Sequence, residues 1–159
     1  MIKLNDLKIS YRIGNRVIEA VNGVTLTIPD GSIVGIAGES GCGKSTLMKA
    51  IYGDIQSPMS LSGGSIEYGM KGADGRAVTT ETIRREWFKS ISYIPQSSMN
   101  SLNPVIRIRD QFTDFPGTDS NKKRVLERAR AYIGKLGLPA EAMDSYPHQL
   151  SGGMRQRVM

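Results

Sequence analysis

Residues 38–45 read Gly-Glu-Ser-Gly-Cys-Gly-Lys-Ser and match the phosphate-loop pattern G-x-x-x-x-G-K-[ST] at every fixed position. Glycine is needed in such a loop because the backbone wraps an anion so closely that Cβ atoms would collide with it. A short apolar run, residues 33–37, precedes the loop, and helical apolar periodicity follows it from Lys44 to Ile51. A glycine-rich turn that matches by chance would lack this order of strand, loop and helix. The sequence therefore predicts an α/β fold that binds a phosphate at the start of a helix.

Three side chains of the loop have expected partners on a nucleotide. The ammonium of Lys44 is expected to meet the outer phosphates of ATP, and the hydroxyl of Ser45 is expected to bind Mg²⁺. Thr46 is expected to contact the inner phosphate. The predicted nucleotide-binding residues of this segment are Gly38, Glu39, Ser40, Gly41, Cys42, Gly43, Lys44, Ser45 and Thr46.

The remaining pattern divides the chain into two parts. Apolar alternation and short apolar runs predict strands at residues 2–11, 17–21, 24–28, 33–37, 65–68 and 91–94, with turns at residues 14–15 and 22–23. Helical periodicity predicts helices at residues 44–51, 80–89, 105–115 and 122–136, the last with Val125, Ala129, Tyr132, Ile133 and Leu136 on one face. We therefore predict a nucleotide-binding α/β core with an antiparallel β lobe in residues 1–95 and a helical lobe in residues 96–159.

A second motif stands near the end of the chain, where residues 150–157 read Leu-Ser-Gly-Gly-Met-Arg-Gln-Arg. This segment resembles the signature motif of ABC ATPases, which are P-loop NTPases. In that family the motif opens a helix, and its serine hydroxyl and glycine amides bind the γ-phosphate of an ATP held by a second subunit. The resemblance implies that Leu150, Ser151, Gly152, Gly153 and Gln156 contact this second ATP. The alternative is a Ser-Gly-Gly turn that caps a basic helix.

The tetrapeptide Leu-Ser-Gly-Gly also stands at residues 61–64, where it is followed by a strand pattern at residues 65–68. No helix N-terminus is expected there, so we interpret this copy as a hairpin-type turn without a role in nucleotide binding. The repeat shows that the tetrapeptide alone is not specific. Only the copy at residues 150–153 is followed by a basic helix.

Two further residues take roles from the same resemblance. Residues 93–96, Tyr-Ile-Pro-Gln, resemble the Q-loop, whose glutamine reaches Mg²⁺ and the attacking water and connects the two lobes. Gln96 is therefore the implied catalytic and metal-binding residue, and a surface-loop glutamine is the alternative. Tyr11, upstream of the phosphate loop, is placed like the aromatic residue that stacks on adenine in this family. An ordinary strand tyrosine is the alternative there.

A finer resemblance is to the ATPases of dipeptide, oligopeptide and nickel importers. It rests on Ser-Leu-Asn-Pro at residues 101–104 and Tyr-Pro-His at residues 146–148, with Gln149 where those proteins have glutamate. It covers the whole chain, although residues 53–90 match only loosely. The resemblance implies an ATP-hydrolysing subunit in the cytoplasm, on the inner face of the cell membrane. Its implied partners are a second ATPase subunit, identical or different, the permease subunits and, indirectly, a solute-binding protein.

The carboxylates that an ABC ATPase needs for Mg²⁺ and water follow four apolar strand residues as Asp-Glu. None of the fifteen acidic residues here stands in that context, and the single histidine, His148, precedes the signature rather than following such a strand. In the family these elements come after the signature helix. We therefore expect a fold that is incomplete at its C-terminus and a chain that does not hydrolyse ATP alone. A nucleotide-binding module without turnover is an alternative.

Composition excludes several other classes of protein. One cysteine and one histidine leave no disulfide framework and no Cys/His zinc cluster. No apolar run approaches the ~20 residues of a membrane span, and the N-terminus lacks a signal-peptide core. The net charge of +6 is spread along the chain, so nucleic-acid binding is disfavoured. A non-transport ABC ATPase that acts on nucleic acid remains the alternative function.

Overall fold

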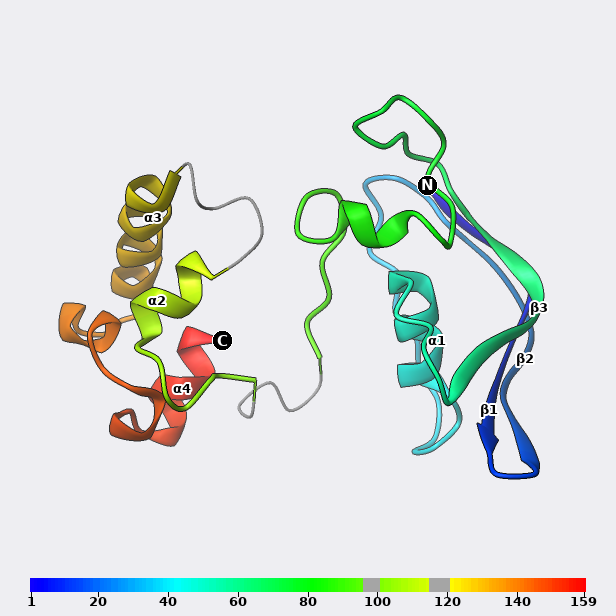
Figure 1. Cartoon of the computed structure of the whole chain (residues 1–159), viewed down its shortest axis with the longest axis horizontal. Coiled ribbons are helices and arrows are strands. Elements are labelled where there is room, and N and C mark those ends of the chain that lie inside the picture. Colours follow the sequence, from blue (N-terminus) through cyan, green and yellow to red (C-terminus); the bar gives the residue numbers. More distant parts are fainter. Residues whose placement is uncertain (96–100, 115–120) are drawn as a thin grey trace. The chain divides into compact units, whose positions relative to one another are not determined.

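The chain folds into two compact units, Met1–Tyr93 and Ile94–Met159 (Figure 1). The structure, a computed structural model, describes residues 1–95, 101–114 and 121–159. The first unit holds the strands and the helix that follows the phosphate loop, whereas the second unit is helical. The boundary between the units falls two residues before the predicted one.

A three-stranded antiparallel sheet forms the frame of the first unit, in the order β2-β1-β3. Its strands are β1 (Ile2–Ile13), β2 (Arg16–Ile28) and β3 (Met59–Tyr68). The predicted turn at residues 14–15 joins β1 to β2, with Gly14 at φ +58°. A bulge at Asp6 shifts the alternation of β1 by one residue, so Leu4, Leu7 and Ile9 are all fully buried.

Helix α1 (Lys44–Tyr52) packs on this sheet and completes the core of the first unit (Figure 1). It begins at the predicted residue and buries Leu47, Ala50 and Ile51 among the strand side chains. Gly53 ends the helix at φ +80°, and a Cβ there would lie 2.1 Å from Ile83 of the 3₁₀ helix η1 (Ile83–Glu86). Only glycine can therefore end α1 in this position.

Side-chain donors fasten the C-terminal end of α1. The hydroxyl of Tyr68 donates to the carbonyl of Ile51 at 2.8 Å, and the indole of Trp87 donates to the carbonyl of Tyr52 at 2.9 Å. Burial, and to a smaller extent the charge of Glu81, raises the pKa of Tyr68 to about 12, so its hydroxyl remains a donor well above neutral pH. The helix that follows the phosphate loop is thus held at its far end.

Two predicted buried strands are not formed. Residues 33–37 pair with no strand in the part of the chain that the structure describes, and Ile33 is fully exposed. Residues 91–94 form only a single bridge, between Ile91 and Trp87, and Ile94 is 84% exposed. A strand needs a continuous ladder of hydrogen bonds to a neighbour, which neither segment forms among the described residues. The prediction of these strands from apolar composition was wrong.

Two predicted turns are parts of strands instead. Residues 22–23 lie within β2, and residues 61–64 lie within β3. They flank the bulge at Asp6, which itself has φ +45°, in the central strand β1. Gly23 and Gly64 have φ of +72° and +73°, so each neighbouring strand follows the bulge with a left-handed glycine. The prediction of turns at these two places was wrong, because the glycines accommodate a bulge in the neighbouring strand.

Two predicted helices are shorter than expected. The helix predicted at residues 80–89 is reduced to η1, because Trp87 leaves the helical conformation at ψ 136°. The helix predicted at residues 105–115 becomes α2 (Ile108–Thr113), and residue 115 lies outside the described residues. The side chain of Asn103 accepts a hydrogen bond from the amide of Val105 at 3.1 Å, which favours a turn over a helical start.

The described helices of the second unit pack around an apolar cluster. Besides α2 the unit contains α3 (Lys122–Lys135), the 3₁₀ helices η4 (Ala140–Met143) and η5 (Pro147–Gln149), and α4 (Gly152–Val158). Helix α3 has almost the predicted bounds, but Tyr132 and Leu136 of its predicted apolar face are 58% and 45% exposed. The buried members of the cluster are Ile108, Ala129, Ile133, Leu138, Ala142, Met143 and Leu150.

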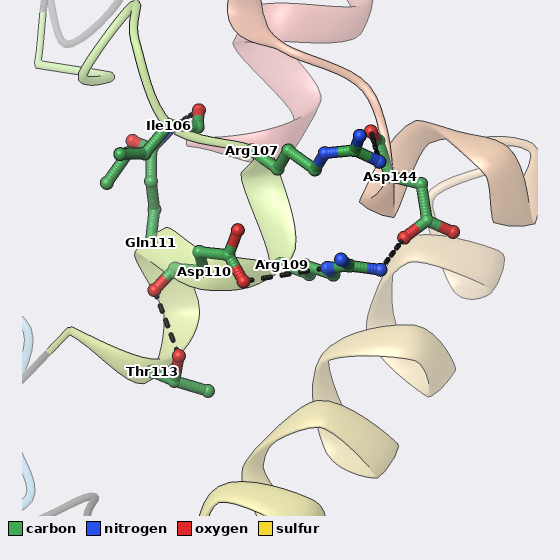
Figure 2. A network of polar contacts seen from close by, with 7 residues as sticks. All are labelled: Ile106, Arg107, Arg109, Asp110, Gln111, Thr113 and Asp144. Carbon is green, nitrogen blue, oxygen red and sulfur yellow. Dashed lines mark hydrogen bonds and ion pairs between the residues drawn. The ribbon is translucent and has the colours of Figure 1, made fainter.

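Polar contacts join the start of α2 to the segment after η4 (Figure 2). The guanidinium of Arg109 pairs with the carboxylate of Asp144, and Arg107 donates to the carbonyl of Asp144 at 3.1 Å. These contacts hold the segment that leads into the second Leu-Ser-Gly-Gly motif.

Within the described ranges, no helix is long and apolar enough to cross a membrane.

Candidate functional site

The phosphate loop turns sharply into α1 from residues 33–37, which are exposed except for the partly buried Ile36. Gly41 has φ +82°, and Gly43, the residue that precedes the helix, has φ +97°. A Cβ on Gly43 would lie 2.3 Å from the carbonyl oxygen of Ala20 in β2, so the loop touches the sheet where only glycine fits. A bond of 2.9 Å from the amide of Leu47 to the carbonyl of Gly43 begins the helix.

The N-terminus of α1 is open to an anion. No side chain in the described part of the chain caps the helix, and no acidic residue stands in its first turn. The first amides of a helix need acceptors, and a phosphate supplies them together with a charge that suits the helix dipole. The sequence prediction of a helix start at a glycine-rich loop is therefore matched by an N-terminus of the required kind.

Lys44 lies over the loop rather than in the core. Its ammonium donates to the carbonyls of Gly38 at 2.7 Å and Glu39 at 2.5 Å, and it lies 3.5 Å from the sulfur of Cys42. A phosphate oxygen is a stronger acceptor than a carbonyl because it is charged. The exposed hydroxyl of Ser45 is a ligand of the kind that Mg²⁺ prefers. The donors of this loop thus fit a nucleotide phosphate chain with its Mg²⁺.

Tyr11 reaches the first turn of α1 from β1. Its hydroxyl lies 3.2 Å from the hydroxyl of Thr46, and its ring packs partly against the core of the first unit. The structure thus brings together two residues that were predicted from the sequence for different reasons. Stacking of Tyr11 on adenine stays a prediction, as does contact between Thr46 and the inner phosphate.

The second Leu-Ser-Gly-Gly motif opens α4, as expected. Ser151 is the N-cap, and its hydroxyl accepts a hydrogen bond from the amide of Met154 at 3.3 Å. Leu150 is only 5% exposed and belongs to the apolar cluster of the second unit, so its side chain anchors the motif. Gln156 is exposed on the helix.

Neither the backbone conformation nor the packing of the described residues requires glycine at the two glycine positions of this motif. Both lie in α4 without a left-handed φ, and a Cβ on Gly152 or Gly153 would have no described atom within 4 Å. A helix is less stable with glycine than with alanine at an interior position, by about 1 kcal/mol. In the other copy, by contrast, a Cβ on Gly64 would lie 2.2 Å from the carbonyl oxygen of Asp6. The fold needs Gly64, whereas the glycines of α4 indicate a surface kept free for a close approach.

The metal-binding part of the predicted site is only partly visible. Gln96 lies outside the described residues. Among the residues that are described, no group of three or more His, Cys, Asp and Glu could hold a metal ion. Ser45 is therefore the one predicted Mg²⁺ ligand whose position is described.

Arg157 was not among the functional residues predicted from the sequence. Its guanidinium donates to the carbonyl of Gly153 within α4 and to two carbonyls at the end of α3. The contact between Arg157 and Gly153 could have been predicted from their spacing, because residues four apart lie on one face of a helix. The contact with α3 had no such local signal.

Alkylation of Cys42 is expected to block nucleotide binding, and Mg²⁺ with ATP is expected to slow the alkylation. The reason is position: Cys42 is exposed in the phosphate loop, and an added group would occupy the space in front of α1. Because the chain has a single cysteine, maleimide labelling can be read by mass spectrometry on the intact protein. A Cys42→Ala variant controls for reaction elsewhere. Equal labelling rates with and without saturating nucleotide would contradict this prediction.

Comparison with known proteins agrees with the geometry. The model of the ABC transporter family matches residues 21–159. The dipeptide transport ATP-binding protein DppD of Caldanaerobacter subterraneus is 33% identical, over 100% of this chain and 49% of that protein. The oligopeptide transport ATP-binding protein AppD of Bacillus subtilis is 37% identical, again over 100% and 49%. The chain thus spans about half the length of the curated relatives it matches.

Solved structures show the same fold. A dimeric bacterial ABC transporter cassette is similar with a TM-score of 0.70 and 25% identity, over 99% of this chain and 66% of that one. A dimeric ATP-binding cassette in a post-hydrolysis state, bound to ADP and Pi, gives a TM-score of 0.68 at the same identity and coverage. With its phosphate loop, its signature helix and a family match over most of its length, this chain belongs to the ABC transporter family.

Proposed function

We propose that this chain is the nucleotide-binding part of the ATP-binding subunit of an importer, which couples ATP binding and hydrolysis to the uptake of peptides or a similar solute. The observation that carries the proposal is the complete phosphate loop in front of a helix N-terminus that no described side chain caps. The names of the two relatives reported above, a dipeptide and an oligopeptide transport ATP-binding protein, support the choice of solute.

In this proposal the phosphate loop binds ATP within the chain. The amides that open α1 bind phosphate oxygens, and Lys44 leaves the carbonyls of Gly38 and Glu39 for a charged acceptor. Ser45 and Gln96 hold Mg²⁺, which neutralises charge on the phosphate oxygens. Gln96 also orients the attacking water, and Tyr11 stacks on the adenine.

A second ATP is bound through the signature helix of a partner subunit. The hydroxyl of Ser151 and the backbone of Gly152 and Gly153 approach the γ-phosphate, and Gln156 lies beside them. The open space next to both glycines supports this role, because a flat backbone surface admits another molecule at close range. The partner is a second copy of this chain or a different ATP-binding subunit, and the two solved structures reported above are dimers.

The remaining partners follow from the proposed transport function. Permease subunits would carry the solute across the membrane, and a solute-binding protein would deliver it to them. The chain would then act in the cytoplasm, at the inner face of the cell membrane. The support is the word "transport" in the names of the relatives, together with the match to the transporter family.

The proposal is tested by association of two copies of the chain driven by nucleotide. Sedimentation velocity with Mg²⁺ and a non-hydrolysable ATP analogue is expected to show a dimer that ADP does not support. Ser151→Arg is expected to weaken this dimer about tenfold to a hundredfold, because a large side chain is forced into a packed contact.

Ser62→Arg is the matched control, since Ser62 is the exposed serine of the other Leu-Ser-Gly-Gly copy. It is expected to leave the dimer unchanged. Association that does not depend on nucleotide, or that is the same in the Ser151→Arg variant, would contradict the proposed role of the signature.

A further inference from the structure

Arg157 connects the signature helix to the end of α3. Its Nη1 donates to the carbonyl of Leu136 at 2.9 Å and to that of Gly137 at 3.3 Å, and its Nε donates to the carbonyl of Gly153 at 3.3 Å. All four residues belong to the second unit. One side chain therefore binds the signature backbone and the neighbouring helix together.

The end of α3 is shaped to receive this guanidinium. Gly137 follows the C-cap residue Leu136 at φ +66°, a left-handed conformation that does not continue the helix. The last carbonyls of a helix lack partners within it and carry the negative end of its dipole. A planar guanidinium has five donors in a fixed arrangement, so it can bind these carbonyls and a further one at the same time.

The bond from Arg157 to the Gly153 carbonyl is connected to the signature serine through a peptide group. The carbonyl of Gly153 and the amide of Met154 belong to the same rigid peptide group. That amide donates to the hydroxyl oxygen of Ser151 at 3.3 Å. The bond from the Arg157 side chain supplements the helical hydrogen bond of the Gly153 carbonyl in α4, and any reorientation of this peptide group would also move the donor that holds Ser151.

The state of the Ser151 hydroxyl follows from these bonds. Its oxygen accepts a hydrogen bond from the amide, so its own hydrogen is left to donate to an acceptor outside the helix. A phosphate oxygen is such an acceptor. The direction of the hydroxyl depends on the orientation of the peptide group that follows Gly153.

We propose that Arg157 is a positioning residue, which fixes the peptide group between Gly153 and Met154 and thereby orients the Ser151 hydroxyl toward the nucleotide of the partner subunit. This inference rests on the proposed function of the signature. Arg157 itself does not touch the nucleotide. If Arg157 only fastened α4 to α3, it would make the same contacts with Leu136 and Gly137, but its removal would not change the orientation of the Ser151 hydroxyl.

Arg157→Lys separates these two roles. An ammonium on a long stem can reach the carbonyls at the end of α3, but it is a point charge and cannot also hold the carbonyl of Gly153 in the same geometry. The lysine variant is therefore expected to keep the Tm of the parent chain. Its nucleotide-driven dimer is expected to be weakened, as in Arg157→Met.

The decisive experiment is a double-mutant cycle on the nucleotide-driven dimer of the 159-residue chain. Arg157→Met and Ser151→Ala are each expected to weaken the dimer about tenfold, the effect of one lost hydrogen bond to a charged group. The double variant is expected to be weakened about tenfold as well, because both changes remove one coupled interaction. The affinity of the chain for nucleotide at its own phosphate loop is expected to stay unchanged in all three.

Lys135→Met is the matched control, because it removes a positive charge from the same end of α3 at an exposed residue whose ammonium lies over the Tyr132 ring. It is expected to leave the dimer unchanged. Additive effects of about a hundredfold in the double variant, or a lysine variant that restores the dimer together with the Tm, would overturn the inference. If Ser151→Ala alone has no effect, the proposed function of the signature fails, and the inference fails with it.

Discussion

Lys44→Ala is expected to reduce the affinity of the chain for ATP and ADP by about a hundredfold or more, since the ammonium would donate at least two hydrogen bonds to charged phosphate oxygens. The fold is expected to survive. Among the described residues, the hydrogen-bond partners of the ammonium all belong to the loop: the carbonyls of Gly38 and Glu39 and the sulfur of Cys42. Isothermal titration calorimetry with each nucleotide measures the loss.

Lys49→Ala is the matched control for this prediction. Lys49 is exposed in the last turn of the same helix, α1, at the end opposite the phosphate loop. Its removal deletes the same charge without touching the site. Both variants are expected to show the helical circular dichroism of the parent chain. Equal nucleotide affinity of Lys44→Ala and the parent would refute the phosphate loop as the binding site.

The parts of the fold that were predicted correctly depend on local signals. Helix α1 begins at Lys44 because a left-handed glycine precedes it, and α4 begins after Ser151 because a serine hydroxyl caps it. The turn at residues 14–15 was predicted from the same kind of signal. Each of these features is determined by a few neighbouring residues, so the sequence contains the information in one place.

The parts that were predicted wrongly depend on distant partners. The apolar run at residues 33–37 resembles a buried strand, but a strand exists only where another strand supplies hydrogen bonds. The glycines at residues 22–23 and 61–64 were read as turns because the bulge they accommodate originates at Asp6, in another strand. Nothing in the local sequence distinguishes these cases.

The candidate site likewise contains features that local sequence predicts and features that depend on distant partners. The phosphate loop and the signature were found from their residues, but three contacts were not: the bond between Tyr11 and Thr46, the burial of Leu150, and the bonds from Arg157 to the end of α3. Each joins residues that the folded chain brings together. A motif identifies the groups that meet a ligand, whereas the groups that hold the motif in place become visible only in the structure.

The two copies of Leu-Ser-Gly-Gly are expected to respond in opposite ways to the same substitution. Gly64→Ala is expected to lower the free energy of unfolding by about 2–4 kcal/mol, because alanine must adopt φ +73° and its Cβ would lie 2.2 Å from the carbonyl oxygen of Asp6. The obstacle is backbone of the central strand, which cannot rotate away. Urea unfolding followed by circular dichroism measures the loss.

Gly153→Ala is expected to raise the free energy of unfolding by about 0.5–1 kcal/mol, because alanine favours the helix and no described atom lies within 4 Å of the new Cβ. The same variant is expected to weaken the nucleotide-driven dimer, since the methyl group stands where the γ-phosphate of the partner would approach. Stability and association would thus change in opposite directions at one residue. A Gly153→Ala chain that is more stable and still dimerises like the parent would show that this glycine has no role in binding the second ATP.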